Sequence, residues 1–299
     1  MMKMSMYLAE DCVRLVVGDM KRRLHIHKCE NYQLHAGTLI NNVITDEDEV
    51  RKVLIKISHD YAAYANRVNL ILTSSKIITK VLQVPVLPRR ALLELTKREL
   101  EGFADPEADM VYDYGTIACR NATNDGGTIL CAAVERSVIR EYTELFAGCG
   151  LRVKTIDTAL NAAAQLLTAM PEFAGKTYIF SVLDGRNMMS ILYTGGDYTY
   201  TSRIRLLSER ASLEIWDEIE KELKSILLFQ EARRSEYTLS DVFVSGITDQ
   251  ERREMIPRLA KNIGADIRFL NDTEAISVGS GCDFKLSDYI YTTGSLLRR

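Results

Sequence analysis

The chain has 299 residues, of which 46% are hydrophobic and 26% are charged, and its formal net charge is −3. This length allows a large buried core in two domains or one bilobed domain, and the near-neutral charge excludes a broadly basic surface, so we expect no nucleic-acid partner. No apolar run approaches the roughly eighteen residues that span a bilayer. Glu10 and Asp11 interrupt what would be the apolar core of a signal peptide, so we expect a cytoplasmic protein without direct membrane insertion.

Neither cysteine nor histidine spacing predicts a metal site. His25 and His27 share one side of a predicted strand, but no third ligand is suggested nearby. The cysteines are scattered without a C-x-x-C pair, and we expect them to be reduced thiols. They are Cys12, Cys29, Cys119, Cys131, Cys149 and Cys282.

The first part of the chain predicts short strands followed by a helix. Strands are expected at 7–17, 23–27, 32–39 and 68–72. A helix is expected at 46–66, where Thr45 and Asp48 resemble a capping box.

Residues 77–103 combine a strand and an amphipathic helix. Alternation over 78–85 predicts the strand, and Pro85 and Pro88 end it. Pro88 suits the first turn of a helix that carries an apolar stripe. The pattern alone indicates an ordinary strand and helix packed on a core.

The remaining elements form two series of the same kind. The first series ends with strands at 110–117, 128–134 and 152–156 and helices at 136–149 and 159–170, with a turn at Asn124, Asp125, Gly126 and Gly127. The second has strands at 177–183, 187–193, 198–204, 241–245 and 266–270, helices at 211–233 and 250–263, and a hairpin turn at Gly195 and Gly196. Three meandering strands followed by alternating helices and strands therefore occur twice.

Several segments together resemble one protein family. Residues 77–103 and the strand with Tyr112, Asp113 and Tyr114 resemble PilM, the actin-like cytoplasmic protein of type IV pilus assembly. Three further segments resemble its strand-to-helix "VD" junction, the strand entering its adenosine-side glycine turn, and its closing "TAIGLALR" helix. These are 156–160, 242–246 and 291–297. Their order and spacing identify the chain as a divergent member.

The resemblance implies an α/β protein with a duplicated ribonuclease H-like fold, the fold of actin-like ATPases. The first lobe is predicted at 1–157 with a small α+β subdomain inserted at about 86–150. The second lobe is predicted at 158–299, with a last helix at about 288–299 that packs back on the first lobe.

The nucleotide turns of this fold need an acidic residue and a close backbone approach in each half. Tyr7 and Ala9 stand where the family's first turn has aspartate and glycine, and Glu10, Asp11 and Cys12 replace its hydroxyls. The later turns also depart from the family pattern. In the second turn, Val182 stands where the family has aspartate, and Met188 and Met189 stand where it has threonines. In the third turn, Gly246 is followed by Ile247 instead of another glycine.

We therefore predict a pseudo-ATPase with no catalytic residue and no required cofactor. A shifted alignment of the second turn still offers a carboxylate and a glycine. If ATP and magnesium bind, the residues expected to hold them are Asp184, Gly185, Ser245 and Gly246.

The resemblance also implies a partner, the N-terminal cytoplasmic tail of a PilN-like bitopic membrane protein. The groove for it is expected between the first lobe and the inserted subdomain. Its candidate residues are Val81, Gln83, Val84, Arg89 and Arg90. Other platform or motor proteins, a homo-oligomer or ring, and a location at the inner face of the cell membrane are further expectations.

Two other functions remain open. One is an actin-like switch or filament protein that binds ATP. The other is a small-metabolite kinase, which needs a catalytic carboxylate and intact phosphate turns and is therefore least favoured. Type II secretion platforms use related subunits, so the machine served is also open.

Overall fold

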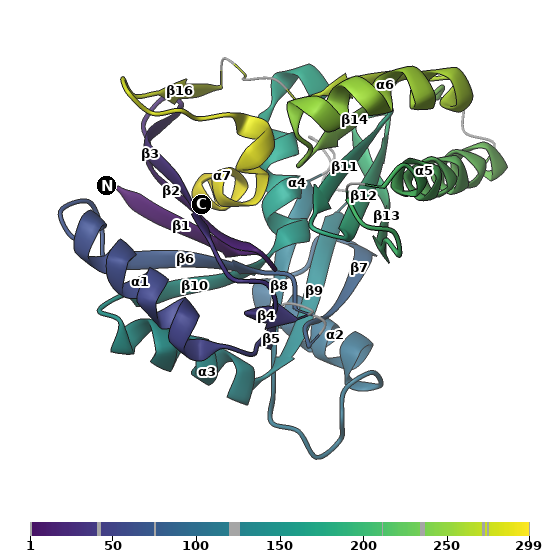
Figure 1. The fold of residues 1–299 in the computed structure, drawn as a ribbon. Coiled ribbons are helices and arrows are strands. Elements are labelled where there is room, and N and C mark those ends of the chain that lie inside the picture. The colour runs from purple at the N-terminus through teal and green to yellow at the C-terminus, as the bar shows by residue number, and fades with distance from the viewer. Residues whose placement is uncertain are drawn as a thin grey trace. The chain divides into compact units, whose positions relative to one another are not determined.

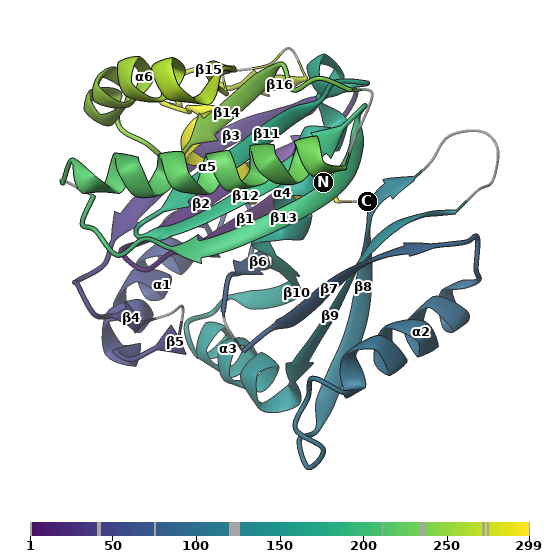
Figure 2. The same cartoon turned by 90° about the vertical axis from the view of Figure 1, so that its right-hand side faces the viewer.

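The computed structural model describes residues 2–40, 43–74, 76–119, 126–210, 212–233, 237–270, 273 and 275–298. The predicted turn residues Asn124 and Asp125, the predicted helix start Ala211 and the terminal Arg299 lie outside these residues. The chain forms two compact units (Figures 1 and 2). The first comprises Met1–Ala169, Glu274–Phe284 and Tyr291–Arg299, and the second comprises Met170–Thr273 and Lys285–Ile290.

A six-stranded sheet forms the centre of the first unit, in the order β10-β6-β1-β2-β3-β16. Strands β1 to β3 are an antiparallel meander, and β6 and β10 continue the sheet in parallel. The strands are β1 (Lys3–Leu8), β2 (Cys12–Met20), β3 (Leu24–Gln33), β6 (Arg67–Leu72), β10 (Arg152–Thr158) and β16 (Ile276–Val278). Two short strands, β4 (Leu39–Ile40) and β5 (Val43–Ile44), pair separately.

The predicted division of the first three strands is wrong. A turn at Ala9, Glu10 and Asp11 splits the predicted strand 7–17, because two adjacent carboxylates are better solvated in a hairpin than in a sheet. The strand expected at 23–27 continues to Gln33 as the single strand β3, which takes in only the first two residues of the segment expected as a separate strand at 32–39. The later residues of β3 are mostly polar and are half-buried or exposed.

Helices α1 (Glu47–Tyr61) and α3 (Arg136–Gly148) cover one face of this sheet (Figure 1) and bury a shared apolar core with it. The predicted capping box at Thr45 and Asp48 is wrong. The Asp46 side chain accepts the hydrogen bond from the Glu49 N–H instead, at 3.1 Å. The Thr45 hydroxyl donates to the Thr38 carbonyl at 2.9 Å.

A smaller three-stranded sheet belongs to the same unit and has the order β7-β9-β8. It consists of β7 (Ile78–Val84), β8 (Met110–Cys119) and β9 (Gly127–Glu135), and α2 (Arg89–Glu101) covers one face (Figure 2). Pro88 is the N-cap of α2 and not part of its first turn. Val84, Leu100 and Ile129 are among the buried residues of this small core.

Two helices pack closely on the other face of the six-stranded sheet (Figure 1). They are α4 (Ala159–Ala169) and α7 (Ile290–Leu297), whose residues from Tyr291 onward belong to the first unit. A Cβ added at Gly294 in α7 would lie 1.9 Å from the Ala162 carbonyl oxygen in α4. Glycine is therefore required at position 294 for this approach.

The second unit repeats the strand order of the first. Its sheet runs β13-β12-β11-β14-β15, which matches β3-β2-β1-β6-β10 in connection and direction. Helices α5 (Glu214–Ala232) and α6 (Asp249–Ile263) pack on it, and Trp216 is buried in its core. The strands are β11 (Tyr178–Asp184), β12 (Asn187–Thr194), β13 (Asp197–Arg205), β14 (Asp241–Ser245) and β15 (Asp266–Phe269). Among the described helices of either unit, none is long and apolar enough to cross a membrane.

Candidate functional site

A groove of about 300 Å³ lies within the first unit between two edge strands. Strand β10 ends the six-stranded sheet and β8 ends the three-stranded sheet. The groove is lined from β8 by Val111, Asp113, Tyr114 and Gly115, from β9 by Leu130, Ala132 and Val134, from α3 by Ile139 and Thr143, from β10 by residues 153–158, and by Ile77, Asn161 and Arg298. Two exposed strand edges thus border one mostly apolar channel.

A β-bulge shapes the β10 side of the groove. The register of β10 with β6 shifts between Val153 and Thr155, which leaves Lys154 as the extra residue. A bulge bends a strand and changes the direction of its side chains. Val153 and Ile156 pack partly against the sheet core, while Lys154 is exposed and lines the groove.

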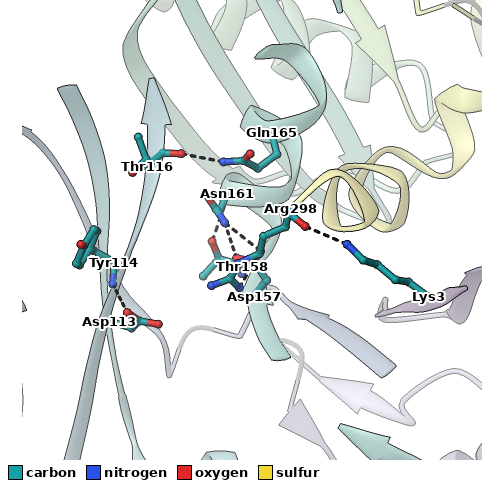
Figure 3. Close-up of polar contacts among 9 residues, drawn as sticks. All are labelled: Lys3, Asp113, Tyr114, Thr116, Asp157, Thr158, Asn161, Gln165 and Arg298. Atoms are coloured by element: carbon teal, nitrogen blue, oxygen red, sulfur yellow. Dashed lines mark hydrogen bonds and ion pairs between the residues drawn. The ribbon is translucent and has the colours of Figure 1, made fainter. Parts of the chain in front are cut away.

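The junction of β10 with α4 places a buried carboxylate in the lining of the groove, and Figure 3 shows its polar contacts. Asp157 is 7% exposed. It accepts hydrogen bonds from the Asn161 side-chain amide at 2.9 and 3.0 Å and from the Thr158 N–H at 2.8 Å. Arg298 Nη1 lies 3.5 Å from it. Burial raises the pKa of the Asp157 carboxyl, although the Arg298 charge and these hydrogen bonds oppose the rise.

Asn161 contributes an acceptor that has no hydrogen-bond partner among the described residues. Its side chain is 4% exposed, and its Oδ1 is buried. The amide packs directly on β8, since a Cβ added at Gly115 would lie 2.8 Å from this oxygen. A buried acceptor without a donor costs about 1–3 kcal/mol, so a donor group that reached Oδ1 would gain from binding there.

The end of the chain completes the groove. Lys3 in β1 donates to the Leu296 carbonyl at 3.4 Å and to the Arg298 carbonyl at 3.1 Å, and Figure 3 shows the second of these bonds. Both bonds satisfy carbonyls at the end of α7. Burial, and the nearby charge of Lys154, lower the pKa of Lys3. The position of Arg298 beside Asp157 therefore depends on how α7 is docked.

The five groove residues that were predicted from the sequence lie on β7 and α2 in the structure. Val81, Gln83 and Val84 are on β7, which is the opposite edge from β8. Val84 is buried in the small core, and Gln83 is exposed. Arg89 and Arg90 begin α2 and are exposed. None of these five residues lines the groove described above.

Three contributors to this groove were not named as site residues from the sequence. Asp157 lies in the segment 156–160 that resembles the family's "VD" junction, Asn161 directly follows that segment, and Arg298 is one of the two arginines at positions 298 and 299. The resemblance at this junction was the sequence signal that could have pointed to Asp157 and Asn161. Their convergence depends on contacts between β10, α4 and the end of the chain.

The turn predicted to face a first phosphate lies between β1 and β2. Tyr7, near the end of β1, is 1% exposed and stacks edge-on against Tyr291, with ring centroids 4.9 Å apart. Its hydroxyl lies 3.4 Å from Thr73 Oγ1. The Ala9 N–H donates to the Cys12 carbonyl at 2.9 Å and closes the turn on itself. An aromatic ring thus occupies the position where a carboxylate is expected.

The structure brings the two predicted turns of the second unit together. Asp184, which is 5% exposed, ends β11, and Gly185 follows with φ 57°. Ser245 ends β14 beside Val182 of β11. Gly246 has φ 75°, and a Cβ there would lie 1.9 Å from the Leu183 carbonyl oxygen, so only glycine fits.

Residues around these turns already have packing partners in the second unit. Met188 and Met189 are buried. Ile247 packs partly against the core, and Thr248 caps α6. These side chains are therefore engaged in the fold of the unit itself.

Arg210 connects the same two turns. Its guanidinium donates to the carbonyls of Gly185 and Gly246 at 3.3 and 2.9 Å. Two further hydrogen bonds, both 2.7 Å long, go to the carboxylate of Glu251. Both turns therefore direct a carbonyl at a protein cation, whereas a phosphate-binding turn directs N–H groups at an anion.

Replacing Glu251 by glutamine is expected to lower the free energy of unfolding of the second unit by about 2 kcal/mol at pH 7. Burial opposes ionisation of Glu251, but Arg210 and the Thr248 N–H outweigh it and lower its pKa. A lowered pKa contributes stability above the unfolded-state value and loses it as pH falls through the folded-state value. The difference between wild type and variant should therefore shrink below about pH 5.

The unfolding of the second unit can be followed separately, because Trp216 is the chain's one tryptophan and lies in this unit. Urea titrations monitored by Trp216 fluorescence would give the free energies of unfolding of the wild type and of the Glu251→Gln variant. Glu254→Gln, an exposed position on the same helix, should change them by less than about 0.5 kcal/mol. An equal loss in both variants would contradict the assigned role of Glu251.

The two strand histidines each have a protein partner. His25 Nδ1 lies 2.8 Å from Ser277 Oγ, and His27 Nε2 lies 3.3 Å from Asp19 Oδ1. Within the described part of the chain, no group of three or more His, Cys, Asp or Glu side chains is placed to hold a metal ion.

The family model described as Type IV pilus assembly protein PilM matches residues 9–207. Among solved structures, the chain resembles the PilM-PilN type IV pilus biogenesis complex at a TM-score of 0.78, with 16% identity over 99% of this chain and 96% of that one. No curated protein sequence matches significantly.

Two other solved structures share the fold. One is a protein with actin-like ATPase fold and unknown function from Bacteroides thetaiotaomicron, with a TM-score of 0.56, 8% identity, and 90% of each chain covered. The other is the cytoplasmic domain of EpsL, an inner membrane component of the type II secretion system of Vibrio cholerae. Its TM-score is 0.52, with 12% identity over 100% of this chain and 96% of that one. These similarities confirm the predicted actin-like fold.

Proposed function

Because the chain belongs to the PilM family of type IV pilus assembly proteins, we propose that it is a non-catalytic scaffold. In this proposal the groove between β8 and β10 holds the N-terminal cytoplasmic tail of a PilN-like bitopic membrane protein. The observation that carries the proposal is the groove itself, an apolar channel bordered by two strand edges. The similarity to the solved structure of a PilM-PilN complex supports the choice of partner.

The groove fits an extended peptide better than a compact ligand. Exposed strand edges bind extended segments through main-chain hydrogen bonds, while side-chain pockets supply specificity. Its charged lining residues are two acids, Asp113 and Asp157, and two bases, Lys154 and Arg298, so the lining charges balance. We therefore expect a mostly apolar, extended segment that offers at least one donor to Asn161 Oδ1.

This role places the protein at the inner face of the cell membrane through its partner, and not through a membrane segment of its own. Other platform or motor proteins, and further copies of the chain in a ring, are part of the same proposal. The family supports a pilus platform over a type II secretion platform.

The proposal includes the absence of ATP hydrolysis. Two observations support it, namely the buried Tyr7 at the end of β1 and the Arg210 hydrogen bonds to the Gly185 and Gly246 carbonyls. The residues present therefore fit magnesium and a triphosphate poorly. Asp184 and Gly185 are the groups that would matter most if nucleotide still bound.

Calorimetric titration with a synthetic peptide of the partner's tail tests the scaffold. The peptide should be the N-terminal tail of the bitopic protein encoded beside this chain's gene, with a scrambled peptide of the same composition as control. We expect micromolar binding of the native tail and none of the scrambled one. Equal binding of both peptides, or of neither, would refute the assignment.

The same protein titrated with ATP and magnesium is expected to give no binding heat and no phosphate release above the buffer rate. The physical reason is that no carboxylate stands at Tyr7, while Arg210 already holds the two glycine turns. An Asp184→Ala variant provides the matched measurement. Micromolar ATP binding that this variant abolishes would instead favour the nucleotide-dependent switch.

A further inference from the structure

Two cysteines distant in sequence meet in the first unit. The sulfur atoms of Cys29 and Cys282 lie 3.0 Å apart, although 253 positions separate the residues. Carbon atoms in contact lie about 3.5–4.0 Å apart, and sulfur is larger than carbon. Cys29 Sγ also lies 3.5 Å from the Asp283 carbonyl oxygen. The two thiols are therefore packed more closely than ordinary neighbours.

The backbone holds this pair together on both sides. Strand β16 pairs with β3 in parallel, with Val278 opposite Ile26, and the Gly279 N–H then donates to the Ile26 carbonyl at 2.8 Å. A turn follows in which the Cys282 N–H donates to the Gly279 carbonyl at 3.3 Å. This turn brings the chain back beside β3 at Cys29. The approach thus depends on sheet pairing and not on one side-chain rotamer.

These two cysteines differ from three of the others. Cys29 and Cys282 are half-buried, whereas Cys12, Cys131 and Cys149 are buried. Burial raises the pKa of the Cys131 and Cys149 thiols, which disfavours the reactive thiolate. An oxidant in solution therefore reaches Cys29 and Cys282 more easily.

We infer that Cys29 and Cys282 form a redox-active pair, which a peroxide oxidises to a disulfide. One thiolate attacks a peroxide oxygen and becomes a sulfenic acid, and hydroxide leaves and takes up the thiol proton to form water. The second thiolate then attacks this sulfur, and the sulfenic oxygen leaves as a second water with the second proton. Two thiols and one hydrogen peroxide thus give one disulfide and two waters. A small dithiol reverses the step by exchange.

The disulfide would link the segment 274–284 covalently to the first unit. Residues 274–284 are the stretch by which the chain returns from the second unit to the first before it leaves again at Lys285. Oxidation would link this stretch covalently to β3, in addition to the short β16 pairing. Cross-links across long sequence separations restrict the unfolded chain most. The oxidised protein should therefore unfold at a higher temperature than the reduced one.

The test treats fully reduced wild-type protein with hydrogen peroxide, blocks the remaining thiols with N-ethylmaleimide and maps the peptides by mass spectrometry. We expect one cross-linked pair that contains Cys29 and Cys282, and a thiol count that falls from the six of the sequence to four. The unfolding midpoint should rise by about 5 °C and return after treatment with dithiothreitol.

Three single variants complete the design. Cys29→Ser and Cys282→Ser should each lose the cross-link and the rise in midpoint, whereas Cys131→Ser should keep both. The wild-type peptide map does not depend on how these variants fold. A cross-link between any other pair, or irreversible oxidation with no cross-link at all, would overturn the inference.

Discussion

A Val111→Glu variant is expected to bind the partner tail at least about a hundredfold more weakly than the wild type. Val111 is half-buried on β8 and lines the groove. A glutamate there brings a charge into an apolar channel that a bound peptide would cover, and an unpaired covered charge is strongly unfavourable. A hundredfold loss corresponds to about 2.7 kcal/mol of binding free energy. Calorimetric titration of both proteins with the same tail peptide measures it.

Val81→Glu is the matched control. Val81 is also a half-buried valine on an edge strand of the three-stranded sheet, but it lies on β7 and does not line the groove. Its binding constant should stay within about threefold of the wild type. Circular dichroism should show that both variants keep their fold. If Val81→Glu lost binding while Val111→Glu retained it, the peptide would bind along β7, as the sequence suggested, and the β8 groove would be rejected.

These two valines show what the sequence could and could not predict. Alternation over 78–85 predicted the strand β7 to within one residue, because side chains in a strand face opposite sides by a local rule. Which strand lies at which edge depends on pairing between residues far apart in sequence. The order β7-β9-β8 leaves β8, and not β7, beside β10 in the groove.

In the rest of the fold, too, local patterns predicted some elements correctly and misled at others. Strand β14 has the predicted bounds, and the second unit's hairpin at Gly195 and Gly196 has the two positive φ angles that such a turn needs. The alternation pattern missed the β1–β2 hairpin, although the family resemblance placed a turn there, because Glu10 and Asp11 carry neither a glycine nor a proline signal. Alternation that continues across a tight turn looks like one long strand.

The candidate sites were harder to predict because single polar residues create them. Arg210 lies in a segment with no helix or strand of its own, and nothing in its neighbours indicates that it reaches Gly185, Gly246 and Glu251. Arg298 is one of two arginines at the chain end, yet only its contact with Asp157 places it in the groove. The contacts of these two arginines join residues far apart in sequence, so they required the structure.

Replacing Gly294 by alanine is expected to lower the free energy of unfolding of the first unit by about 3 kcal/mol. The added Cβ would lie 1.9 Å from the Ala162 carbonyl oxygen and 2.6 Å from its carbonyl carbon, so the backbones of α7 and α4 must separate. A flexible side chain could move aside, but here the obstacle is backbone. Urea unfolding followed by circular dichroism, compared with Trp216 fluorescence for the second unit, would locate the loss.

Gly102→Ala is the control, because Gly102 at the end of α2 has φ −70° and no atom within 4 Å of an added Cβ. It should leave stability unchanged or raise it by up to about 1 kcal/mol.

The displaced helix should also affect the groove. Lys3 holds the Leu296 and Arg298 carbonyls, and Arg298 lies beside Asp157, so a shift of α7 moves a lining charge. We therefore expect Gly294→Ala to weaken tail binding about tenfold under conditions where it is still folded, and Gly102→Ala to leave it unchanged. A stability loss with full binding would show that the end of the chain supports the fold without shaping the groove.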